Sequence, residues 1–294
     1  MGRGSGAQAM PTTTTPKAMP PAAAEAPLPT TTTAPKATTT TAAPAPALPS
    51  GTPASSGGFP NASTTGVKAG VALTPAGSMT VTEPGKVIEN LHIRGTVTIE
   101  ADNVTIRNTL IDNTGTYPIR ATNKNKNLVV EDVEIKGNGK GNVAVYGGNY
   151  TLRRVDIHGT LDGPRVEGDN VVIEDSYVHH LHRVDGGHHD AIQIIRGVNV
   201  KIVGNNLQAY NPDTKDPMNA AIQIGSLNGP TGDVLVENNL MNGGNYTVNA
   251  GKSEGNSFTF RNNTFGNNAR FGILSDGPGV SWVGNIMQGS GAPA

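Results

Sequence analysis

The chain has 294 residues, a net charge of -1 and only 15% charged residues, which excludes binding to nucleic acid or an anionic membrane through a broad basic surface. It contains no cysteine, so disulfides, thiol chemistry and cysteine-based zinc sites are excluded as well. No apolar run reaches the ~20 residues of a membrane-spanning helix. The first ten residues also lack the apolar stretch of a signal peptide.

Within residues 1–58, the stretch from about residue 8 consists of nearly nothing but Pro, Thr, Ala and Ser. Such a segment has too little apolar surface to offset the entropy of ordering, and its prolines favour extended polyproline II stretches. The composition predicts a disordered linker or stalk that holds the following domain away from a surface or another module.

Residues 59–294 form a second domain in which one short phrase returns every 21 to 24 residues, with two longer steps of 29 and 34. The copies are NVTIRN from 103, NLVVED from 127, NYTLRR from 149, NVVIED from 170, NVKIVGN from 199 and DVLVENN from 233, followed by the weaker SFTFRNN and GVSWVGN. Within each copy the second and fourth residues are apolar and the residues between them are mostly polar, which predicts a strand with one buried and one wet face. A further strand precedes each copy, as in DAIQII and AAIQIG.

The last four copies carry asparagine at one common position: Asn205, Asn239, Asn263 and Asn285. Asparagines stacked at a corner between two strands can donate and accept amide hydrogen bonds along the stack. We therefore expect these four side chains to form a structural ladder.

A unit of about 22 residues cannot bury its own apolar face and must stack on its neighbours, and too few residues separate the strands for a helix. The sequence therefore predicts an all-β solenoid, a parallel β-helix of about eight or nine rungs, right-handed by the crossover rule. A jelly roll is the alternative, but its strands need not keep a fixed register over eight copies.

On these repeats, residues 59–294 resemble the right-handed parallel β-helix superfamily of pectate lyases, polygalacturonases and phage tailspikes. The opening FPNASTTGVKAGVALTP and the following GKVIENLHIRGTVTIEADNVTIRNTLI are similar to the cap and first rungs of secreted or phage-borne bacterial β-helix proteins. The resemblance concerns the fold, and chemistry has to be argued from the residues.

The two long steps of the repeat place extra residues in loops at 179–189 and 208–219, which leave consecutive rungs at the same corner. Loops on a rigid scaffold are common carriers of binding and catalysis, and these two can wall a cleft. The strands that follow them align column for column. If Ile192 and Ile222 point inward, then His189, Asn219, Gln193 and Gln223 point outward. The same outward columns in neighbouring rungs hold further polar residues: Arg120, Tyr146, Glu167 and Asn249.

This strip of amides, imidazole and charged groups, with about one rung (~5 Å) between members, suits an extended chain of sugars. HHDAIQI resembles the Asn-Thr-Asp-Gly-apolar-Asp strand of polygalacturonases, and Asp190 carries over. Gln193 stands where the second carboxylate would be, and the next rung supplies Asn219 in place of an aspartate. The missing carboxylates argue against inverting hydrolysis.

A lyase needs only a base beside the uronate and a cation to stabilise the enolate. We expect His189 to be the base, with His188, Asp190 and Arg183 as further catalytic candidates, while Arg183 and Arg165 engage carboxylates. The residues expected to bind substrate are Arg165, Glu167, Gln193, Asn219, Gln223, Lys215 and Tyr146. A loop whose Asp and His side chains cap turns is an equally good interpretation.

A metal is not required by the sequence. Calcium, which many similar proteins use, would need clustered carboxylates, and the available set is Asp185, Asp190, Asp213 and Asp216. A transition metal would need convergence of His179, His182, His188 and Asp190, whose spacing fits no established motif.

The sequence thus predicts an extracellular or surface-displayed protein that binds an acidic polysaccharide or cell-surface glycan, with cleavage by β-elimination as a further hypothesis. The alternative is a non-catalytic structural or adhesive protein, such as a phage tail fibre in a virion or a surface glycan-binding module. The glycan, the oligomeric state and the need for a cofactor are left open.

Overall fold

The computed structural model describes residues 58–294 with the exception of 113–114, 123–124, 140–142, 185, 226, 252–256 and 276–278. The linker or stalk predicted over 1–58 lies outside the described residues, apart from Gly58. In the described part of the chain, no helix is long and apolar enough to span a membrane.

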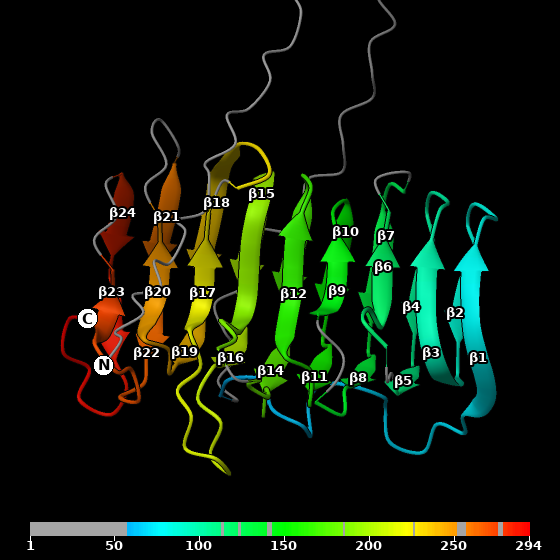
Figure 1. Ribbon diagram of the computed structural model, residues 1–294, viewed down its shortest axis with the longest axis horizontal. Helices are drawn as coiled ribbons and strands as arrows, with labels where there is room; N and C mark the ends of the chain where they lie inside the picture. Colours follow the sequence, from blue (N-terminus) through cyan, green and yellow to red (C-terminus); the bar gives the residue numbers. More distant parts are fainter. Residues whose placement is uncertain are drawn as a thin grey trace, which may run out of the picture. The chain divides into compact units, whose positions relative to one another are not determined.

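Strands that lie one turn apart in the sequence pair side by side and form three columns (Figure 1). The first column holds β1 (Thr74–Val81), β3 (Leu91–Ile99), β6 (Ile119–Ala121), β9 (Val143–Gly147), β12 (Asp162–Glu167), β15 (Asp190–Val203), β17 (Ala220–Ile224), β20 (Tyr246–Ala250) and β23 (Gly272–Leu274). The second holds β2 (Val87–Glu89), β4 (Thr105–Arg107), β7 (Leu128–Glu131), β10 (Tyr150–Arg153), β13 (Val171–Glu174), β18 (Thr231–Glu237), β21 (Phe258–Arg261) and β24 (Val280–Val283). The third holds β5 (Leu110–Asp112), β8 (Glu134–Lys136), β11 (Asp156–His158), β14 (Tyr177–His179), β16 (Asn206–Gln208), β19 (Leu240–Asn242), β22 (Thr264–Phe265) and β25 (Ile286–Met287).

The chain passes through these columns in turn, and most rungs contribute three short strands. β3 continues through a corner, because it pairs with β5 at its start and with β6 at its end. β15 is long because it continues through a corner, pairing with β12 and β17 at its start and with β13 and β18 at its end. Pairs such as β7–β10, β13–β15 and β18–β21 are parallel and keep the repeated phrases in register. The predicted all-β solenoid is confirmed, with one more strand per rung than the two that the sequence required.

The apolar positions of the repeat fill the interior. In the first seven copies the second and fourth residues and the apolar residue of the third strand are all buried, from Val104, Ile106 and Ile111 to Phe258, Phe260 and Phe265. The corresponding residues of the last rung, Val280, Trp282 and Met287, are only partly buried. Every rung buries its apolar face against its neighbours, so the inward residues form one continuous core.

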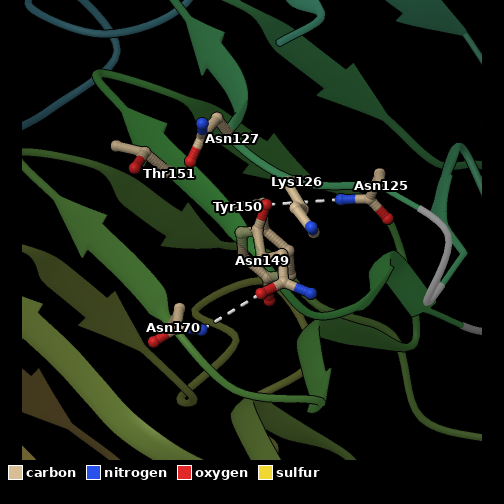
Figure 2. A pocket seen from close by; sticks show the side chains of 7 residues that line it. All are labelled: Asn125, Lys126, Asn127, Asn149, Tyr150, Thr151 and Asn170. Carbon is tan, nitrogen blue, oxygen red and sulfur yellow. Dashed lines mark hydrogen bonds between the residues drawn. The ribbon is translucent and has the colours of Figure 1, made fainter. Parts of the chain in front are cut away.

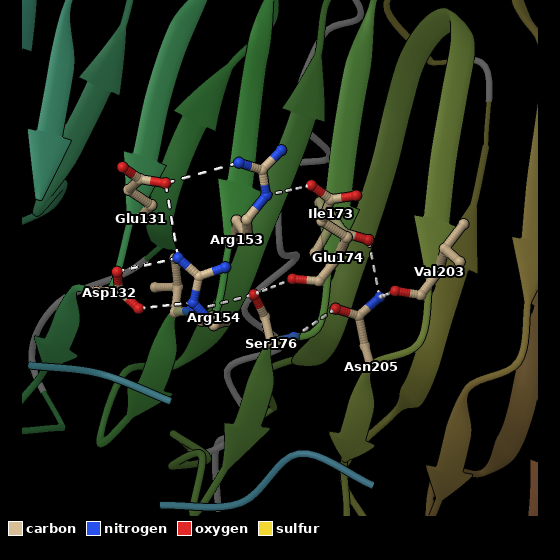
Figure 3. Close-up of polar contacts among 10 residues, drawn as sticks. Glu131, Asp132, Arg153, Arg154, Ile173, Glu174, Ser176, Val203 and Asn205 are labelled. Atoms are coloured by element: carbon tan, nitrogen blue, oxygen red, sulfur yellow. Dashed lines mark hydrogen bonds and ion pairs between the residues drawn. The ribbon is translucent and has the colours of Figure 1, made fainter. Parts of the chain in front are cut away.

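The predicted asparagine ladder is present at the corner between the second and third columns. The Nδ2 groups of Asn205, Asn239 and Asn263 donate to the Oδ1 atoms of Asn239, Asn263 and Asn285 over 2.9, 3.0 and 2.9 Å. All four side chains are buried. Ser176 continues the ladder one rung earlier, because its backbone N–H donates to Oδ1 of Asn205 over 2.9 Å (Figure 3).

The segment that precedes β1 runs along the third column and contacts the middle rungs (Figure 1). The Gly66 N–H donates to the Arg154 carbonyl over 2.9 Å, and the Asn206 amide donates to the Pro60 carbonyl over 2.8 Å. The Lys68 ammonium lies 2.8 Å from a carboxylate oxygen of Asp132. This segment therefore covers one corner of the rungs.

A ladder of alternating charge lies on the outer face of the second column. Paired positions read Glu89, Arg107, Glu131, Arg153, Glu174, Val203, Glu237, Arg261 and Val283. Arg153 lies between two carboxylates, with its Nε 2.6 Å from Glu174 and an Nη 3.6 Å from Glu131 (Figure 3). Opposite charges directly across a strand pair stabilise a sheet by roughly 0.2–1 kcal/mol.

Val203 interrupts this charge ladder between Glu174 and Glu237. We expect Val203→Arg to raise the free energy of unfolding by about 0.5 kcal/mol, measured by urea denaturation at low salt, and the gain to vanish in 1 M NaCl. The matched control is Val283→Arg, which places the same side chain next to Arg261 and is expected to give no gain. Equal effects at the two positions would show that charge pairing is not the cause.

Candidate functional site

The two long loops lie together on consecutive rungs, as their equal position in the repeat predicts. The first joins β14 to β15 and the second joins β16 to β17. The Asn211 amide of the second loop donates to the Leu181 carbonyl of the first over 2.8 Å. The two loops therefore form a single wall beside the first column.

Arg183 holds the two loops together and does not face a ligand. Its guanidinium donates to both carboxylate oxygens of Asp216 over 2.7 and 3.1 Å and to the Gly187 carbonyl over 2.6 Å. Burial would raise the pKa of Asp216, but hydrogen bonds from Arg183 and the Met218 N–H outweigh it and hold the pKa below its ordinary value. The pair joins the first loop to the second through a bidentate contact.

A groove of about 370 Å³ runs beside the loops along the outer face of β15, β17 and β20. Its polar lining comes from His188, Gln193, Asn219, Gln223 and Asn249, and its remaining lining from Ile194, Ile195, Gly225 and Leu227. We call these nine residues the amide groove. The five polar residues were all expected at the site from the sequence, and the structure brings them together.

The rung register explains this convergence. Gln193 lies beside Gln223, and Gln223 beside Asn249, as paired positions of neighbouring strands. In the other direction the same column continues to Arg165, Tyr146 and Arg120. Side chains one rung apart are ~4.8 Å apart, so the column offers polar groups at regular short intervals.

Glu167 was expected in this column, but that expectation is wrong. A bulge between Val166 and Glu167 shifts the register, so Glu167 pairs with Arg196 and the column position belongs to Arg165. The Glu167 carboxylate accepts a hydrogen bond from the Asn228 amide over 2.6 Å. It also faces Tyr146, where its hydrogen bond, together with burial, raises the pKa of the phenol to about 12.

The expected place of His189 on the solvent-facing strip is also wrong. The side chain is buried, with only 6% of the residue exposed, and it is absent from the groove lining. The first loop folds over it, so closely that a Cβ on Gly187 would lie only 2.2 Å from Nε2 of the ring. Within the described chain neither ring nitrogen has a hydrogen-bond partner, and Nδ1 lies 3.4 Å from Asp162. His188 is the imidazole that reaches the groove.

Asp190 is fully buried beneath the groove amides. Its Oδ1 accepts a hydrogen bond from Asn219 over 2.8 Å, and its Oδ2 accepts one from Gln193 over 3.3 Å. Burial, with a smaller contribution from the charge of Asp162, raises the pKa of Asp190 to about 7 against the opposing hydrogen bonds. Asp190 thus positions two groove amides from below.

Asp162 is the buried partner that sequence reasoning missed. It accepts hydrogen bonds from the Asp190 N–H over 2.8 Å and from Arg165 Nη2 over 3.0 Å, while Arg165 Nε donates to Gln193 Oε1 over 2.6 Å. Arg165 is therefore neutralised by a carboxylate and orients a groove amide. Counting back three residues from the Arg165–Gln193 pair would have placed Asp162 opposite Asp190.

The remaining candidates lie apart from one another. Lys215 is exposed in the second loop, outside the groove lining. His179 binds Asp156 over 2.8 Å on the third column, and His182 is exposed. Asp213 approaches His180 at 3.9 Å, and Asp185 lies outside the described residues.

Neither candidate metal set is therefore assembled. Asp216 is engaged by Arg183, and Asp190 is enclosed beneath the amides. Among the residues that the structure describes, no three His, Cys, Asp or Glu side chains are arranged to hold a metal ion. We derive no metal-dependent step for the groove.

Comparison with known proteins agrees with this architecture. Residues 69–228 match the family model described as the right-handed beta helix region, in accord with the handedness expected from the crossover rule. No curated protein matches the chain. A solved hyperthermoactive exopolygalacturonase from Thermotoga maritima is similar over 68% of this chain and 53% of its own, with 14% identity and a TM-score of 0.42. The chain thus spans about half the length of that enzyme.

Proposed function

The chain belongs to the right-handed β-helix family, and from this premise we propose that its amide groove binds an extended glycan. The observation that carries the proposal is the column of Gln193, Gln223 and Asn249 on three successive rungs, inside a groove of about 370 Å³. Each amide can both donate to and accept from a hydroxyl, which matches the surface of a sugar chain.

Apolar groups beside the amides support a sugar rather than a fully polar ligand. Leu227 is 89% exposed, and it lines the groove together with Ile194 and Ile195. A pyranose ring has apolar C–H faces as well as hydroxyls, so it can use both kinds of surface. Sites for small molecules combine mainly apolar walls with a few placed polar groups in this way.

The contacts favour recognition over β-elimination. The expected base, His189, is buried, and the two guanidinium groups expected to engage uronate carboxylates, Arg165 and Arg183, are each paired with an aspartate. His188 is left as the imidazole within reach of a bound sugar. The proposal therefore commits to glycan binding and does not require an acidic glycan.

The expected setting of the protein stays a prediction. A β-helix carried on a Pro/Thr-rich segment fits an extracellular or surface-displayed protein that binds glycans, and a virion tail protein fits equally. Both settings use the groove for recognition.

We expect the double variant Gln193→Ala/Gln223→Ala to bind its best glycan on an array at least tenfold more weakly than the unchanged chain. The reason is that each lost hydrogen bond costs about 1 kcal/mol, and 1.4 kcal/mol corresponds to a factor of ten. Affinities are measured by titration calorimetry with the oligosaccharide that the array selects.

The matched control is Gln208→Ala, which removes the same side chain from the third column, away from the groove. It is expected to leave the affinity unchanged. Equal affinity of the groove double variant and the unchanged chain would refute the proposed site. Absorbance of unsaturated uronate ends, if it appeared with alginate, polygalacturonate, hyaluronan or chondroitin and disappeared in His188→Ala, would instead show a lyase.

A further inference from the structure

A second concave site lies where the strands of the second column begin, and it shares no residue with the amide groove. It has a volume of about 330 Å³ and is lined by Asn125, Lys126, Asn127, Asn149, Tyr150, Thr151 and Asn170 (Figure 2). We call these seven residues the corner notch. Its volume lies near the lower end of the range for small-molecule sites, which suits a ligand of the size of one sugar.

A hydrogen-bonded ladder of asparagines runs along this corner and is broken at the notch. Nδ2 of Asn127 donates to Asn103, that of Asn170 to Asn149 and that of Asn199 to Asn170, over 3.0, 3.2 and 2.9 Å. No corresponding bond joins Asn149 to Asn127 in the described part of the chain. Nδ2 of Asn149 and Oδ1 of Asn127 are therefore left as a donor and an acceptor for another molecule.

These asparagines keep their places because of the backbone. Asn127, Asn149 and Asn170 have φ values of 53°, 55° and 56°, in the left-handed region that asparagine tolerates better than most residues. The corner therefore presents the same amide once per rung. The spacing is fixed by the strands and does not depend on a bound ligand.

Two of the lining residues carry buried polar atoms without a partner among the described residues: Oδ1 of Asn125 and the hydroxyl of Tyr150. The Asn125 amide nitrogen is engaged, because it donates to the carbonyls of Gly148 and Asn149 over 3.2 and 3.3 Å. Burial raises the pKa of Tyr150, whose ring lies among the apolar side chains of the interior. Neither of the two unpartnered atoms is exposed to solvent, so the groups open to a ligand are those of the corner asparagines and Lys126.

The corner notch also contains a cationic side chain, that of Lys126. The side chain of Lys126 lies among the asparagines of the notch (Figure 2). Its backbone N–H donates to Asp102, but within the described chain its ammonium forms no ion pair. The ammonium is thus available for a carboxylate.

We propose that the corner notch binds a small polyhydroxylated carboxylate of the size of one uronic acid. The carboxylate pairs with Lys126, and the hydroxyl groups take the open amide positions of Asn127 and Asn149. A neutral sugar lacks the group for Lys126, and a simple carboxylate lacks the hydroxyls for the amides.

The test is a titration of the full chain with sodium glucuronate, followed by saturation-transfer NMR and calorimetry. We expect saturable binding with a Kd on the order of 1 mM, and at least fivefold weaker binding of glucose and of acetate. Asn149→Gly is expected to weaken glucuronate at least fivefold, because it removes an open amide of the notch while glycine accepts the positive φ of this position. Lys126→Met is expected to abolish the preference for glucuronate over glucose.

Asn199→Gly makes the same replacement at a corner position outside the notch lining, so it serves as the matched control and is expected to leave the affinity unchanged. The groove double variant Gln193→Ala/Gln223→Ala is also expected to bind glucuronate normally, which separates failure of the notch from failure of the groove. Absence of saturable binding, or saturable binding that either Asn149→Gly or Lys126→Met leaves unchanged, would overturn the proposal.

Discussion

Asn239→Ala is expected to lower the free energy of unfolding by about 4 kcal/mol, the largest effect of any single change considered. The Asn239 amide donates to the carbonyls of Ile202 and Glu237 and to Oδ1 of Asn263, over 2.9, 3.0 and 3.0 Å. Its Oδ1 accepts hydrogen bonds from the backbone N–H and the side-chain amide of Asn205 over 2.8 and 2.9 Å. Alanine leaves these partners unpaired in the interior.

The measurement is denaturant unfolding, with coincidence of two spectroscopic probes as the check on two-state behaviour. Asn267→Ala is the matched control, because Asn267 is exposed on the rung that follows. We expect the control to change stability by less than ~0.5 kcal/mol. A loss below ~1 kcal/mol for Asn239→Ala would mean that the ladder adds little to the stacking of the rungs.

The second large effect concerns the pH dependence of stability through Asp190. Its pKa in the folded chain, about 7, lies above the ordinary value of 3.8 that it takes in the unfolded chain. Between these values the unfolded chain releases the proton and the folded chain keeps it, so unfolding becomes more favourable as the pH rises. We expect stability to fall from pH 4 to pH 8, with a contribution from this residue on the order of 3 kcal/mol.

Asp190→Asn removes the titration, so the stability of this variant should fall less steeply between pH 4 and pH 8 than that of the unchanged chain. Asp169→Asn, which replaces an exposed carboxylate, is the control and should retain the original slope. Parallel curves for the unchanged chain and Asp190→Asn would contradict the raised pKa. The carboxyl carbon of Asp190, followed by NMR, reports the same titration directly.

Much of the fold could be predicted from the sequence, because repeated spacing constrains every rung in the same way. The alternation around residues such as Ile106 and Ile173 identifies inward positions, and both are buried. The shared register of Asn205 and Asn239 was sufficient to predict a hydrogen-bonded ladder. The two long steps in the repeat located the loops, and the column alignment brought Gln193 and Gln223 together.

The parts of the site that could not be predicted depend on irregularities that break the period. His189 lies just before a strand, where strict alternation no longer applies, and the loop above it decides that it is buried. Glu167 follows a bulge, which the sequence does not mark. The pairing of Arg183 with Asp216 joins two loops whose paths are set by their own contacts. In each case a local deviation overrides the repeat.

The corner asparagines could have been found earlier. The first six repeated phrases begin with Asn or Asp, as at Asn103 and Asn149, and all six of these residues adopt positive φ. Asn and Asp tolerate a left-handed backbone better than most residues. A corner that needs this backbone conformation in successive rungs therefore explains why the amide recurs. The break in this second ladder, however, depends on side-chain positions that a sequence does not contain.

The claim that the outward amides of successive rungs form one glycan-binding surface is tested most directly by a crystal structure of the chain with the oligosaccharide that the array selects. We predict electron density for consecutive sugar rings along the amide groove, with hydroxyls within 3.2 Å or so of the amides of Gln193 and Gln223. Sugar bound on another face, with the groove filled only by water, would contradict the claim.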